Sequence, residues 1–103
     1  MIQLREALTS PDPRVRAESI ARTARAPGVE PLLIGALEDA EPVVRRAAVR
    51  ALARRQGPAT ARALIRTASS DPASPVRLEA VAAIGRLLQR RLRLEGSGAT
   101  PPG

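Results

Sequence analysis

Apolar residues recur every three or four positions along most of this chain, which is the spacing of one face of a helix. Leu4 and Leu8 stand one turn apart, and Leu33 and Leu37 repeat the same pattern. The pattern predicts three short first helices, over residues 2–9, 29–38 and 59–69. In the third of these, Ile65 occupies the position of Leu33.

The same alignment puts Ser69, a polar residue, opposite Leu8 and Leu37. One row of small residues accompanies these helices, and small residues there allow neighbouring helices to approach closely. The row consists of Ala7, Ala36 and Ala68.

A second helix follows each first helix. Two of these second helices carry apolar stripes at helical spacing. One stripe contains Val44, Ala48, Val49 and Leu52, and the other contains Val76, Ala80, Val81, Ile84, Leu87 and Leu88. In the earliest second helix, Ser19 and Thr23 interrupt the stripe, so this unit is either a frayed cap or needs a partner.

The starts of the second helices share an acid or a hydrogen-bond acceptor directly before a proline. Asp12, Glu41 and Ser74 hold this position. Negative charge and side-chain acceptors suit a helix start, and proline at the first helical position loses no hydrogen bond. Glu41 is a poor cap, so we expect Asp39 to help cap the start of this helix. Gly28 and Gly57 are expected to end the helices of the first two units.

A Val-Arg pair marks each of these units, at residues 15–16, 44–45 and 76–77. Spacings of 29 and 32 residues are typical of a stack of helical repeats. We therefore predict an all-α solenoid of three stacked antiparallel helical hairpins over residues 1–95. The repeats are expected at about 2–27, 29–56 and 58–94, followed by a flexible tail over 96–103.

These residues resemble the HEAT repeat family, in particular its short bacterial form, which is also similar to the repeats of phycobilisome lyases. The family pattern places an Asp in the turn and an Arg six residues later, at the start of the second helix. The resemblance implies a structural ladder between repeats, formed by Arg16, Asp39, Arg45, Asp71 and Arg77. Ser10 replaces the Asp of the first unit, so the ladder is expected to be weaker there.

Composition excludes most chemistry. The chain has no Cys, His, Phe, Tyr or Trp, so the usual general base and the usual metal ligands are missing. Glu38, Asp39 and Glu41 lie in one turn, and a capped turn explains them better than an acid–base pair. We predict no enzymatic activity, no catalytic residues, no metal and no cofactor.

The charge is strongly positive, with a formal net charge of +7 and 17 basic residues, all of them Arg. This bias is typical of a GC-rich, bacterial genome, and the positive charge also favours acidic partners or nucleic acid. The first residues show no basic segment followed by an apolar run, and no apolar stretch reaches the roughly 20 residues that span a bilayer. A cytoplasmic location is the expectation.

A second arginine row follows the second helices and is expected to line the concave face. The candidate partner-binding residues are Arg22, Arg25, Arg50, Arg54, Arg86 and Arg90. The alternative is that cations near the helix C-termini complement the helix dipoles. Leu88, Leu92 and Leu94 have no following repeat to cover them, so they are candidates for capping the stack or for self-association.

Three functions fit these features. The leading hypothesis is a non-enzymatic adaptor that binds an acidic protein surface or helix on a basic concave face, with weak homo-oligomerisation through two unfinished stack ends. The alternative is sequence-nonspecific nucleic-acid binding through the arginine row, without stacking platforms because aromatic residues are absent. An accessory role in a chromophore lyase follows only from the resemblance.

Overall fold

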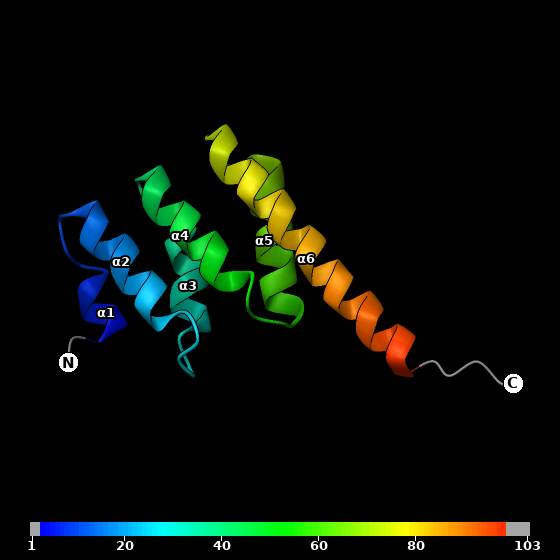
Figure 1. Cartoon of the computed structure of the whole chain (residues 1–103). Helices are drawn as coiled ribbons and strands as arrows, with labels where there is room; N and C mark the ends of the chain where they lie inside the picture. The colour runs from blue at the N-terminus through cyan, green and yellow to red at the C-terminus, as the bar shows by residue number, and fades with distance from the viewer. Residues whose placement is uncertain (1–2, 99–103) are drawn as a thin grey trace, which may run out of the picture.

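The computed structural model describes residues 3–98, with side chains through residue 93. These residues form six helices and no strand (Figure 1). The helices are α1 (Leu4–Ala7), α2 (Pro13–Thr23), α3 (Glu30–Ala36), α4 (Pro42–Leu52), α5 (Pro58–Ser70) and α6 (Ser74–Gly98).

The helices pair into three hairpins that stack side by side. In each hairpin the first helix packs against the second, as α1 does on α2, α3 on α4 and α5 on α6. Neighbouring hairpins meet mainly through their second helices, so α2, α4 and α6 form one layer in front of α1, α3 and α5 in Figure 1. The predicted all-α stack of helical hairpins is confirmed.

Local hydrogen bonds explain where the second helices begin. The Asp12 carboxylate caps α2 by accepting from the Arg14 amide at 2.9 Å. Glu41 makes no side-chain cap on α4, and Asp39 Oδ1 instead accepts from the Glu41 amide at 2.9 Å. Asp71 does the same for the Ala73 amide, so α6 begins at Ser74 itself.

Two glycines permit the turns that join the hairpins. Gly28 and Gly57 have φ values of 79° and 129°, in the region that side chains disfavour. Gly28 follows α2, and Gly57 directly precedes α5. The chain can therefore reverse tightly after each of the first two repeats.

The core is built from aliphatic side chains, because the chain contains no aromatic residue. Its largest fully buried apolar side chains come from five of the six helices and are Ile20, Leu33, Leu52, Leu64, Val44, Val49 and Val76. Alanines fill the spaces between the second helices. Such small side chains allow α2, α4 and α6 to pack closely.

The predicted alignment of the third first helix was wrong by one residue. Leu64 is fully buried, whereas Ile65 is 54% exposed and Ser69 is also exposed. Thr67, instead of Ala68, takes the buried place of Ala36. The physical reason is that α5 runs straight to Ser70 and adds one residue before Asp71, which shifts the buried face back by one position.

Helix ends also differ from the predicted ranges. α1 and α3 are shorter than expected, because the residues that follow Ala7 and Ala36 form turns. α6 continues to Gly98, beyond the predicted start of the tail at residue 96, since no proline interrupts the chain before Pro101. The rest of the predicted tail, 99–103, lies outside the described residues.

Candidate functional site

A buried ion pair joins the second repeat to the third. Arg45 Nε lies 2.8 Å from Asp71 Oδ2, and Arg45 Nη2 donates to Asp71 Oδ1 at 3.1 Å. The remaining guanidinium nitrogen, Nη1, donates to the carbonyl of Asp39 at 2.9 Å. Arg45 therefore bridges the turn of its own repeat and the turn of the next, using the planar fork that suits a carboxylate.

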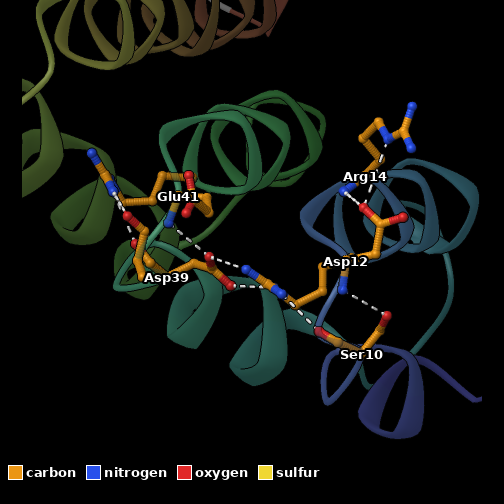
Figure 2. Close-up of polar contacts among 8 residues, drawn as sticks. Ser10, Asp12, Arg14, Asp39 and Glu41 are labelled. Atoms are coloured by element: carbon orange, nitrogen blue, oxygen red, sulfur yellow. Dashed lines mark hydrogen bonds and ion pairs between the residues drawn. The ribbon is translucent and has the colours of Figure 1, made fainter.

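A partly buried pair joins the first repeat to the second with the same geometry. Arg16 Nε and Nη2 donate to the two Asp39 oxygens at 2.9 and 3.0 Å, and Nη1 donates to the Ser10 carbonyl at 2.7 Å. Figure 2 shows that the Asp39 carboxylate also accepts the Glu41 amide. One aspartate thus starts a helix and links two repeats.

The two ends of this ladder differ. Ser10 keeps the local roles of the aspartates, since its carbonyl accepts from Arg16 and its Oγ accepts from the Asp12 amide at 3.1 Å (Figure 2). It offers no carboxylate, and no described repeat precedes it with an arginine. At the other end, Arg77 Nη1 donates to the Asp71 carbonyl at 2.8 Å. Its other nitrogens reach no carboxylate within residues 3–93.

The ladder carboxylates have lowered pKa values. Partial burial raises the pKa of Asp39, but hydrogen bonds from Arg16 and from the Glu41 amide outweigh it and bring the pKa below the usual 3.8. The pKa of Asp71 is lowered in the same way by Arg45 and the Ala73 amide, against the effect of burial. Folding therefore favours the charged form of both groups.

Acid should destabilise the fold through these carboxylates. Because their folded pKa values lie below 3.8, their contribution is complete above the unfolded value and is lost as the pH falls through the folded values. We expect the urea midpoint to stay level between about pH 7 and 5 and to fall below about pH 4. The Asp39→Asn variant should show a shallower fall, and a slope equal to that of the wild type would contradict this assignment.

A lone carboxylate lies among the arginines of α4 and α6. Glu79 Oε1 is 3.0 Å from Arg46 Nε and 3.3 Å from Arg50 Nε, and Glu79 Oε2 is 4.0 Å from Arg86 Nη2. Burial raises the pKa of Glu79, but Arg46 and Arg50 lower it by more, so that the pKa lies below the usual 4.5. Two of the predicted row, Arg50 and Arg86, are thus partly neutralised. The contact of Glu79 was not predicted, because the equivalent position holds Glu18 in α2 but Ala47 in α4 and so carries no consistent signal.

The other members of the predicted row lie in different surroundings. Arg22, Arg25 and Arg54 are exposed, and the last two lie just after the C-terminal caps of α2 and α4. Arg90 does not belong with them. It is half-buried, and its Nη2 donates to the Ala53 carbonyl at 2.7 Å.

One further arginine, Arg55, makes a contact between repeats that was not predicted. Arg55 Nη2 donates to the carbonyl of Ala26, in the connection that follows α2, and Arg90 bonds the carbonyl of Ala53, the C-terminal cap of α4. Both Nε atoms are buried without a hydrogen-bond partner. The two arginines hold different positions in their repeats, so the repeat pattern contains no signal for this contact.

A shallow groove runs between α2 and α4. It has a volume of about 410 Å³, and its floor is made largely of alanines, among them Ala17, Ala21 and Ala47. Three arginines and one acid, together with Val43, complete the lining: Arg46, Arg50, Arg54 and Glu18. The groove combines close access to the backbone with positive charge on its α4 side.

The repeat geometry and the aspartate–arginine ladder agree with the comparison to known families. A model described as HEAT repeats matches residues 3–85. The chain belongs to the HEAT repeat family. No curated protein and no solved structure matches it. HEAT repeats commonly mediate protein–protein interaction and are generally non-enzymatic scaffolds.

Two further findings concern the part of this HEAT chain that the structure describes. Within residues 3–98, no helix is long and apolar enough to cross a membrane. The same residues contain no group of three or more acidic side chains arranged to hold a metal ion.

Proposed function

We propose that this HEAT chain is a non-enzymatic adaptor that binds an acidic protein surface or helix on the face formed by α2, α4 and α6. The observation that carries the proposal is the groove between α2 and α4. Its alanine floor admits a helix or an extended segment closely, and Arg46, Arg50 and Arg54 lie along one side. Carboxylates of a partner would meet these arginines as planar, charge-assisted hydrogen bonds.

Nucleic acid is the weaker candidate for this face. A net charge of +7 favours phosphate binding in general. However, Glu79 lies among Arg46, Arg50 and Arg86, so a carboxylate interrupts the cationic surface that a phosphate backbone would follow. The adaptor hypothesis accommodates Glu79, because a protein partner needs only local charge complementarity.

The test is a capture experiment from native lysate, with nuclease treatment, at low and high salt. Arg25→Glu combined with Arg54→Glu should lower the recovery of the protein partner roughly tenfold or more, since it reverses the charge of Arg54 in the groove lining and of the exposed Arg25 just after the C-terminal cap of α2. Arg5→Glu combined with Arg62→Glu changes the net charge equally on α1 and α5, and should leave recovery unchanged.

Two outcomes would contradict the proposal. Equal loss with both pairs of variants would mean that binding depends on net charge and not on this face. Recovery of nucleic acid alone, lost after nuclease or at high salt, would make nucleic-acid binding the function of the arginine row.

A further inference from the structure

Each second helix uses the same stripe of residues to meet the next repeat. The residue four positions after the ladder arginine is Ile20 in α2, Val49 in α4 and Val81 in α6. Ile20 and Val49 are fully buried, because α4 and α6 cover them, whereas Val81 is 56% exposed. Within the described residues, α6 therefore presents an apolar contact stripe that no repeat covers.

The neighbouring positions show the same difference. Four residues further on, Ala24 and Ala53 are buried, but their counterpart Gly85 is exposed. The stripe continues beyond the length of α2 and α4 with the exposed Leu88 and Leu92. Leu94 was also predicted to take part, but its side chain lies outside the described residues.

A groove lies beside this stripe, between α5 and α6. It has a volume of about 530 Å³ and is mainly apolar, with Pro58, Ala61 and Ile65 on one side and Ile84 and Leu88 on the other. The exposed Ile65 is thus part of the same surface as Leu88. Among the described residues, α6 is the last helix at this end of the stack (Figure 1).

The ladder supplies the charge on this surface. Arg16 and Arg45 each direct Nε and Nη2 to the aspartate of the next repeat. Arg77 is held by its Nη1 bond to the Asp71 carbonyl, in the same way as the other two. Its Nε and Nη2 are therefore the donors that a following aspartate would meet, and no described residue supplies that aspartate.

The opposite end of the stack is built differently. Ser10 stands where the ladder has aspartates, and Ser19 stands where Ala48 and Ala80 are fully buried. Arg22 stands where Ala51 and Ala83 are buried. A second copy of this chain therefore lacks both the carboxylate and the small apolar surface that the exposed end of α6 would need. This polar end also prevents open head-to-tail assembly, which heterologous contacts would otherwise produce.

We propose that the end face formed by Arg77, Val81 and Leu88 of α6 and Ile65 of α5 docks a helical hairpin of another protein. The hairpin would carry a ladder aspartate for Arg77 and a small apolar stripe for α6, and so continue the stack. This surface is separate from the groove between α2 and α4. The proposal therefore stands independently of the adaptor function proposed above.

The experiment uses a variant of this chain as the probe. Ser10→Asp, Ser19→Ala and Arg22→Ala give its first repeat the ladder aspartate and the alanines of the second, and Arg77→Glu closes its own far end. We expect the wild-type chain to bind this probe as a one-to-one complex in sedimentation velocity and calorimetry. A wild-type sample alone should remain monomeric.

Variants of the chain that binds the probe identify the surface involved; each such variant is called a receiver. Arg77→Met should weaken binding of the probe roughly tenfold or more, since it removes the charged partner of the new aspartate. Val81→Asp should abolish binding. The pair Arg25→Glu and Arg54→Glu should leave it unchanged, so a failure of the adaptor proposal remains distinguishable.

Three results would overturn the proposal. One is no binding between the wild-type chain and a probe that circular dichroism shows to be folded. Another is equal binding by the Arg77→Met receiver. The third is self-association of the wild-type chain as tight as its binding of the probe, which would make a second copy the occupant. If the probe does not fold, Ser10→Asp with Arg77→Glu alone replaces it, because Ser10 lies in a turn.

Discussion

Replacing Arg45 with methionine should lower the free energy of unfolding by about 3–5 kcal/mol. The side chain of Asp71 is buried and receives two hydrogen bonds from Arg45. Methionine keeps the apolar stem but leaves this carboxylate buried without its partner, which is the costly way to break an ion pair. Urea unfolding followed by circular dichroism at pH 7 measures the loss.

The same substitution at the other two ladder arginines is the control, because the expected loss of stability differs at each position. Arg16→Met should cost roughly 1–3 kcal/mol, because Asp39 is only partly buried and water can reach it. Arg77→Met should cost less than about 1 kcal/mol, since it removes a bond to a carbonyl and leaves no carboxylate unpaired. Similar losses at all three positions would show that the position in the ladder does not set the cost.

A double variant separates the pair from the penalty of an unpaired charge. Arg45→Met combined with Asp71→Leu removes both charges, so it should recover a large part of the stability that Arg45→Met loses. Asp71 also caps the turn through the Ala73 amide, and this contribution would remain lost. A double variant as unstable as the single one would mean that the turn, and not the ion pair, dominates.

The ladder was implied by the resemblance to HEAT repeats, and its residues could be located because the Asp–Arg spacing is short and local. Asp39 and Arg45 are six residues apart, as are Asp71 and Arg77. In each repeat, one turn and the start of the helix that follows it hold both residues. The repeat period then sets which aspartate each arginine meets. The same logic predicted the helix starts at Pro13 and Pro42, where proline and an acid act locally.

Contacts that cross between repeats without a repeated signal were not predictable. Arg55 and Arg90 bond carbonyls that follow α2 and cap α4, from positions that are not equivalent in the repeat. Glu79 of α6 meets Arg46 and Arg50 of α4, and its position is acidic in α2 but not in α4, so the repeat gives no consistent signal for it. These contacts depend on how far long arginine side chains reach over a neighbouring helix, and periodicity does not describe that reach.

The two ends of the stack illustrate a further limit. Ser19 and Thr23 interrupt one stripe and leucines remain at the other end, a pattern that predicts two unfinished ends. In the structure, Thr23 Oγ1 donates to the Ser19 carbonyl at 2.8 Å, so the hydroxyl is satisfied within α2. The Thr23 hydroxyl therefore needs no partner outside α2, whereas Val81 is exposed at the other end.

The alignment of α5 can be tested by comparing the free energy of unfolding of two variants, Leu64→Ala and Ile65→Ala. Leu64 is fully buried in the core, so truncating it removes apolar contacts and leaves a cavity that the surrounding helices fill only in part. We expect Leu64→Ala to lower the free energy of unfolding by about 2–5 kcal/mol. Ile65→Ala should change it by less than about 0.5 kcal/mol, because that side chain is largely exposed.

The two substitutions are matched in chemistry and adjacent in sequence, so their difference reports only which face of α5 is buried. A larger loss at Ile65 than at Leu64 would restore the alignment that puts Ile65 opposite Leu33, and would remove Ile65 from the end face beside α6. The expected order also has a functional consequence. Ile65→Ala should leave the fold intact while weakening binding of the end-face probe, whereas Leu64→Ala should affect binding only through the loss of folded protein.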